Sequence, residues 1–333
     1  MPGSVLAEVS MQTRTFISIL SALYAMSLMP VLAQEAPPTP PVDPNKTYSP
    51  VAKYSLGDLL KYNMNMKMNM GMTAEKADTP LPKKMEMEVS AVAKMKTVKV
   101  GADGSAVVMI LTESSTVTVN GSKAAAPAAP PMKMEINKLG VAKMSGLEKV
   151  QGAEMFSKMF NLDSLPSMGA VFPDHPVKVS ESWETFMPNP FGGEEKLKIV
   201  STLLGTEKIG GRETLKIKMV INMPMKIAMG ANSQPTKDVS TAIMVMTGSI
   251  NGNSIMNVIE ETGRLVKSIS SMKGDMNMEM KGDAAKQSPF GTNINMKLDG
   301  VTTLALFSEG KVPATPAKAV IKPAIQPAKT KKK

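Results

Sequence analysis

The sequence predicts a mainly β protein, folded as a strongly curved antiparallel sheet or an unclosed barrel of about ten strands with a short helical insert. Two observations support this prediction. Apolar and polar residues alternate over long stretches, as they do on strands with one buried and one solvated face. Glycine-containing turn signals separate these stretches. The chain has 333 residues and is 43% hydrophobic, which is enough to bury a substantial core.

The alternation is clearest from Lys61 to Met72, which reads KYNMNMKMNMGM. Successive side chains of a strand point to opposite faces, so the methionines share one face while asparagines and a lysine share the other. The segment is therefore predicted to be a half-buried strand with a methionine face. The residues of that face are Met64, Met66, Met68, Met70 and Met72.

The same pattern predicts further strands along the chain. They cover residues 84–100, 105–119, 132–144, 177–186, 194–208, 212–229, 241–259, 264–281 and 293–308. Turn signals lie between several of them, at residues 101–104, 120–121, 210–211 and 261–263. Long antiparallel strands joined by tight turns favour a curved sheet or an open barrel.

Residues 147–170 differ from the rest, because their apolar residues recur at helical spacing. Phe156, Met159 and Phe160 are among them, and we expect one or two short helices here. This segment divides the predicted β-rich domain, residues 51–308, into parts 51–146 and 176–308. The two parts are similar in layout, through either internal duplication or the ordinary regularity of antiparallel sheet.

The ends of the chain have other compositions. Residues 1–33 combine Arg14, an apolar run and small residues at a cleavage position, which is typical of a signal peptide; the alternative is an uncleaved anchor. A proline-rich linker, residues 34–50, follows. Residues 309–333 are rich in Lys, Pro and Ala and are expected to be disordered. We therefore expect an exported protein of the periplasm, the cell envelope or the extracellular space.

Composition argues against several classes of function. The chain has no cysteine and one histidine, so no disulfide or zinc–thiolate framework is expected. His175 lies beside Asp174 in a predicted turn, and the acidic pairs Glu86/Glu88 and Glu194/Glu195 occupy positions typical of a solvent face. We expect no enzyme and no cofactor.

The net charge is +10, yet aromatic residues make up only 4% of the chain, and the basic residues alternate along strands instead of clustering. Nucleic acid is therefore an unsuitable partner. The lysine-rich end is either a solvated tail or a tether to an acidic envelope polymer or anionic lipid.

The segment from Phe172 to Trp183, FPDHPVKVSESW, resembles an element of uncharacterised exported bacterial proteins that are akin to the periplasmic lipoprotein-carrier fold. Residues 203–213 and 261–266 are similar to strand pairs of the same proteins. Ser180 stands where a glycine is usual, and the missing cysteine means that this chain lacks the lipid attachment of many such proteins. The resemblance spans residues 54–308. It implies an unclosed barrel around an apolar cavity, with short helices as a lid and no catalytic residues.

The chain contains 32 methionines, many of them paired at i and i+2 on predicted strands. Three interpretations are open. Methionine fills irregular cores, it lines adaptable apolar pockets, and its thioether binds soft ions such as Cu(I) or Ag(I).

The function predicted from the sequence is non-enzymatic binding of an apolar ligand, a lipid or acyl chain, in a methionine-lined cavity. The first methionine strand and Met276, Met278 and Met280 would line the cavity, and the predicted helices would cover it. Trp183 is expected to anchor the core or to lie at the cavity mouth. The alternatives are a structural or adhesive envelope protein with a solid core and a basic tail, and a soft-metal binding protein.

Overall fold

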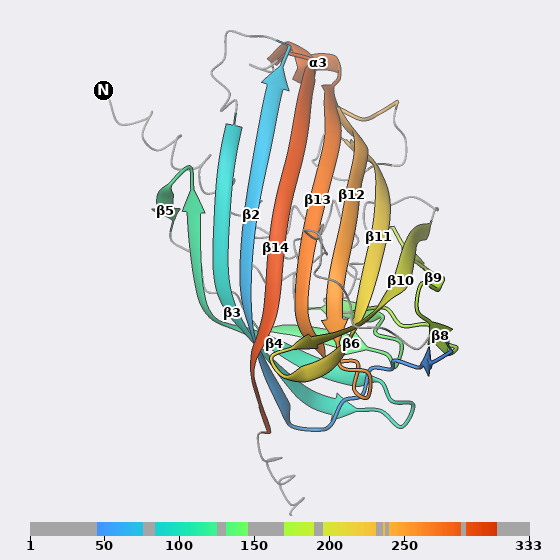
Figure 1. The fold of residues 1–333 in the computed structure, drawn as a ribbon. Helices are drawn as coiled ribbons and strands as arrows, with labels where there is room; N and C mark the ends of the chain where they lie inside the picture. Colours follow the sequence, from blue (N-terminus) through green and yellow to red (C-terminus); the bar gives the residue numbers. More distant parts are fainter. Residues whose placement is uncertain are drawn as a thin grey trace, which may run out of the picture.

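The computed structural model describes residues 45–75, 84–124, 131–145, 170–189, 196–230, 236, 240–287 and 291–311. Most of them belong to one twelve-stranded antiparallel sheet (Figure 1). This confirms the predicted mainly β fold with a large antiparallel sheet that does not close into a barrel. The predicted signal peptide, most of the helical insert 147–170 and residues 312–333 of the predicted tail lie outside the described residues.

The strands follow the chain as two consecutive series. The first contains β2 (Asp58–Ala74), β3 (Lys84–Val100), β4 (Ala106–Val119), β5 (Ser122–Ala124), β6 (Met132–Ile136) and β7 (Ala142–Ser145). The second contains β9 (Ser182–Pro188), β10 (Lys196–Ile209), β11 (Arg212–Met229), β12 (Met244–Val258), β13 (Leu265–Met280) and β14 (Asn293–Lys311). A two-stranded sheet of β1 (Thr47–Tyr48) and β8 (Val177–Lys178) and the short helix α3 (Gly282–Gln287) complete the described elements.

The strand order is β7-β6-β4-β3-β2-β14-β13-β12-β11-β10-β9, with β5 paired to β4. Each series is thus a meander, apart from the short β5, which pairs with β4 and leaves β6 to pair with β4 as well. The first long strand, β2, pairs with the last, β14, from Ala74 opposite Ile294 to Asp58 opposite Lys311. This pairing leaves β7 and β9 as the two edges of the main sheet, and within the described ranges neither edge pairs with a further strand.

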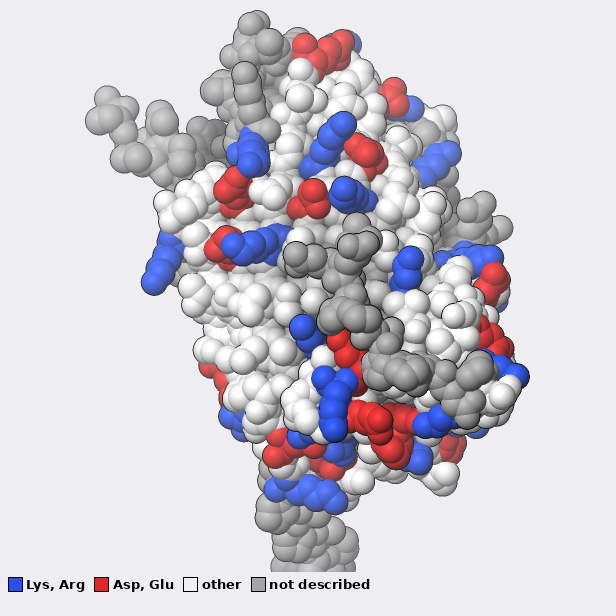
Figure 2. Space-filling view, in the orientation of Figure 1, with Lys and Arg blue, Asp and Glu red and all other residues white. Residues whose placement is uncertain are grey.

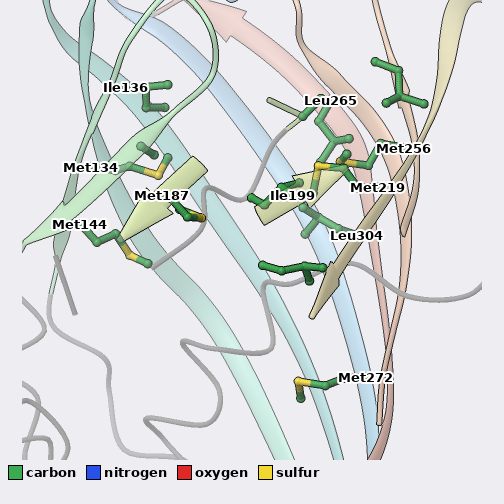
Figure 3. Close-up of a cluster of buried hydrophobic side chains, with 14 of the residues drawn as sticks. Met134, Ile136, Met144, Met187, Ile199, Met219, Met256, Leu265, Met272 and Leu304 are labelled. Atoms are coloured by element: carbon green, nitrogen blue, oxygen red, sulfur yellow. The ribbon is translucent and has the colours of Figure 1, made fainter. Parts of the chain in front are cut away.

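The strand register keeps apolar residues in rows across one face of the sheet. Met64 of β2, for example, lies opposite Ala91 of β3 and Leu304 of β14, and all three are buried. The sheet curls around this face, so that side chains from opposite edges share one core. Figure 3 shows Met134 and Met144, from β6 and β7, facing the same interior as Met187 of β9.

The other face of the sheet is polar and carries ion pairs between neighbouring strands. Lys67 of β2 contacts Glu88 of β3 at 2.7 Å, and Lys198 of β10 contacts Glu184 of β9 at 2.5 Å. Figure 2 shows that basic and acidic side chains are interspersed over the face in view. Exposed pairs of this kind contribute at most about 1 kcal/mol each to stability, so burial of the inner face is the main stabilising term.

Two chain segments close the end of the sheet at which β2 begins. Backbone N–H groups of Ala52 and Lys53 donate to the carbonyls of Lys138 and Thr262, each at 2.9 Å, and the N–H of Phe172 donates to the carbonyl of Leu139 at 2.8 Å. Residues 45–57 and 170–181 therefore tie the β6–β7 and β12–β13 turns together. Their apolar side chains Tyr48, Ala52, Phe172 and Val177 are buried against the core.

Two predicted strands are each divided in the structure. Residues 132–144 form β6 and β7, because the Asn137 side chain accepts hydrogen bonds from the N–H groups of Leu139 and Val141, both at 3.0 Å, and closes a turn. Residues 177–186 form β8 and the start of β9, with a break at Ser180. Ser180 has a positive φ of 69°, a conformation that favours glycine. These divisions, with the short β1 and β5, raise the strand number above the expected ten.

The strand boundaries also extend the predicted domain at both ends. β1 lies within the expected linker, and β14 continues to Lys311, into the expected tail. Within the described ranges, no helix has the length and hydrophobicity needed to cross a membrane.

Candidate apolar ligand site

The inner face of the sheet has a packed zone of buried methionines and isoleucines on β2 and β11. Met64, Met66 and Met68 of β2 lie there, with 2%, 2% and 4% of their surfaces exposed. Met223 of β11 is 1% exposed, and Ile217 is fully buried. The packed zone thus uses methionine as a core residue, and three of the methionines predicted to line a cavity are part of it.

Towards the opposite end of the long strands, near α3 (Figure 1), burial of this face differs between strands, and Met225 and Met229 of β11 are 4% exposed. The other predicted methionines lie here and are partly exposed: Met70, Met72, Met276, Met278 and Met280. Methionines on the adjoining strands share this environment: Met244, Met246 and Met296. We refer to these eight residues as the open methionine zone.

Trp183 is 5% exposed. Its indole Nε1 donates a hydrogen bond of 3.0 Å to the carbonyl oxygen of Val171, which ties β9 to the segment that closes the end of the sheet. The side chain is thus an anchor within the core. Phe156, Met159 and Phe160, the predicted cover of the cavity, lie outside the described residues.

The two edges of the sheet line a concave site that the sequence analysis did not predict. This seam groove has a volume of about 510 Å³, which is within the range of about 300–1,000 Å³ common for small-molecule sites. β9 contributes Phe186, Met187 and Pro188. Strands β3 to β7 and their turns contribute Lys99, Gly101, Ser105, Ala106, Val107, Glu135, Ile136, Asn137, Val141, Ala142 and Lys143.

The groove combines apolar walls with a few charged groups. Phe186 is 58% exposed, although it lies on a strand whose other outward residues are mostly polar. Lys99 has no ion-pair partner among the described residues, whereas Lys143 lies directly opposite Glu135 in the β6–β7 register. An apolar chain with a hydrogen-bonding or anionic end matches this lining.

A second cavity, near the start of β2, is too small for such a ligand. Its volume is about 60 Å³, room for only a few water molecules. Beside it, the Tyr62 hydroxyl donates to the Leu265 carbonyl at 3.1 Å, and Arg264 contacts Asp58 at 2.5 Å. Burial raises the pKa of Tyr54 to about 12, against a smaller lowering by the Arg264 charge. This cluster fastens β2 to the β12–β13 turn.

Of the acidic residues and the histidine considered as candidate catalytic groups, those that the structure describes lie on the surface. Glu86 and Glu88 are outward residues of β3, paired with Lys84 and Lys67. His175 is exposed in a bend, with its Nδ1 2.9 Å from Asp174. Glu194 and Glu195 lie outside the described residues.

Comparison with known proteins identifies no family. No family model matches the chain, and no curated protein matches it. A solved structure of lipovitellin, determined in work on lipid–protein interactions, aligns with 80% of this chain and 26% of its own, at 8% identity and a TM-score of 0.43. A structure from work on the conductivity of engineered proteins and a mutant Rh. blastica porin each align with 74% of this chain, at 8% identity and TM-scores of 0.21 and 0.20. This chain therefore spans about a quarter of the lipovitellin chain.

Proposed function

We propose that this protein binds a lipid or another acyl-chain ligand, without chemical transformation, in the seam groove. The observation that carries the proposal is the groove itself, a concavity of about 510 Å³ between β7 and β9, the two edge strands of the sheet within the described ranges. The proposal keeps the apolar ligand expected from the sequence and moves its site from the methionine face of β2 to the open seam.

Packing favours the seam over the interior. In the packed zone the methionines are 1–4% exposed, so a ligand would have to displace well-packed side chains at a cost of several kcal/mol. At the seam no displacement is needed. The exposed ring of Phe186 and its neighbours offer apolar surface whose burial is worth about 25 cal/mol per Å².

The charged residues that line the groove indicate how the ligand is oriented in it. Lys99 and Lys143 line the groove, together with a single carboxylate, Glu135. An acyl chain with an anionic head group would place its chain on the apolar wall and its head group near Lys99. We further propose that this binding takes place outside the cytoplasm, in line with the signal-like residues 1–33.

The test uses a fluorescent fatty-acid analogue titrated against the full chain. Phe186→Asp puts a charge on the groove wall and should weaken binding at least tenfold. Val301→Asp is the matched control, because Val301 is an outward residue of β14, is 47% exposed and does not line the groove. Its binding should equal that of the wild type. Equal affinity for all three proteins would reject the groove, and no binding by the wild type would reject the function.

A further inference from the structure

Three methionines of the open methionine zone form a row across neighbouring strands. This arrangement cannot be predicted from the sequence alone. Met296 of β14 lies directly opposite Met72 of β2 on one side and Met276 of β13 on the other. Directly paired residues of an antiparallel sheet project from the same face, so the three side chains stand side by side. The next residue in the row, on β12, is Gly248, and backbone atoms of Asp275 and Met276 occupy the place where its Cβ would be.

The spacing of this row suits one small ion. Side chains directly opposite each other in a sheet have Cβ atoms about 4.5–5.5 Å apart. The thioether sulfur is two bonds beyond Cβ on an unbranched, flexible side chain. The outer two methionines can therefore lean toward Met296 and bring three sulfurs to one point above β14.

Three methionines of the row are partly exposed, in contrast to Met225, which follows Gly248 on β11 and is 4% exposed, and to the methionines of the packed zone. Met72, Met276 and Met296 are all partly exposed, whereas Met64, Met66 and Met68 are buried. An ion can reach the first set without opening the core. Three partly exposed thioethers in one row are the feature that points to a ligand.

The donor set selects the class of ion. Thioethers are soft, neutral ligands that favour Cu(I) and similar ions over Mg²⁺, Ca²⁺ and Zn²⁺. The carboxylates nearest in sequence to Met276, Asp275 and Glu279, alternate with the inward methionines of β13 and are exposed. Among the described residues, no group of three or more His, Cys, Asp or Glu side chains offers a competing site. Neutral donors in a partly apolar setting suit a monovalent ion best.

We propose that Met72, Met276 and Met296 form a three-thioether site for a soft monovalent ion, Cu(I) or Ag(I). Binding involves no redox step, because the ion keeps its charge and displaces only water. The site is separate from the seam groove and does not depend on the function proposed for that groove.

The experiment titrates Ag(I) into the full chain labelled with ¹³C at the methionine methyl groups. The wild type should bind the ion, with the largest shifts at Met72, Met276 and Met296. The triple variant M72L/M276L/M296L should lose affinity at least tenfold. The matched control M64L/M66L/M68L makes the same change in the packed zone and should bind as the wild type does. Met-to-Leu exchange conserves volume and costs less than about 1.5 kcal/mol per site, so both variants should fold.

Three results would overturn the proposal: unchanged affinity in the first variant, largest shifts at other methionines, or no binding to the wild type. The methyl shifts are read on the wild type, so the outcome does not depend on either variant folding. Titration of the fatty-acid analogue into M72L/M276L/M296L should give wild-type affinity, which separates failure of this site from failure of the seam groove.

Discussion

Replacing single methionines by alanine should show that the inner face has two zones of different packing. Met223 is 1% exposed and lies opposite Ile250, which is 4% exposed. Met223→Ala removes three heavy atoms at a place where the hydrogen-bonded backbones of β11 and β12 prevent collapse. We expect a loss of about 2–5 kcal/mol in the free energy of unfolding. Met72→Ala removes the same atoms from a partly exposed position and should cost about 1 kcal/mol.

The assay is urea unfolding followed by the fluorescence of Trp183, the only tryptophan in the chain, which is buried in the native state. The slopes with urea should agree among the variants, so that midpoints report stability. Met223→Leu is the control and should cost less than about 1.5 kcal/mol. Equal losses for the two alanine variants, or a loss below about 1 kcal/mol at Met223, would refute the division into a packed and an open zone.

Two further predictions concern the closed end of the sheet. Gly140→Ala should destabilise the protein far more than Gly211→Ala. Both glycines have φ near +80°, but a Cβ at Gly140 would lie 2.2 Å from the Ala170 carbonyl oxygen, whereas Gly211 borders open space. Similar unfolding midpoints for the two variants would contradict this. Tyr54 has a pKa of about 12, raised from 10.0 by burial, so its contribution to stability is present in full below pH 10 and lost as pH rises through 12. Tyr54→Phe should therefore flatten the fall in unfolding free energy between pH 10 and 12, and an unchanged slope would argue against burial of the hydroxyl.

Local features of the sequence predicted most of the strands. The bounds expected for residues 84–100 and 212–229 coincide with β3 and β11, because alternation and glycine turns are properties of neighbouring residues. The turn at Asn137 was missed, since its closure depends on an asparagine side chain that also occurs on predicted strands, as at Asn65.

The sites depend on pairings between distant segments. Every inward methionine of β2 follows the same alternation, so the pattern could not distinguish buried Met66 from partly exposed Met72. That difference arises from what the curled sheet places against each residue. The seam groove joins residues around 99–107, 135–143 and 186–188, and its only local signal was Phe186, an apolar residue on the polar side of a short strand.

The pairing of the first long strand with the last has a consequence for biosynthesis. Ala74 cannot pair with Ile294 until more than two hundred further residues have been synthesised. At about 5–20 residues per second, translation of that stretch takes about 10–45 seconds. Until then β2 can form its hairpin with β3, but its other edge stays exposed, which is a hazard for aggregation. A strand of methionine, asparagine and lysine is less prone to intermolecular β-pairing than one of valine and isoleucine. The unusual composition of β2 therefore suits a strand with one edge that must remain unpaired until most of the chain has been synthesised.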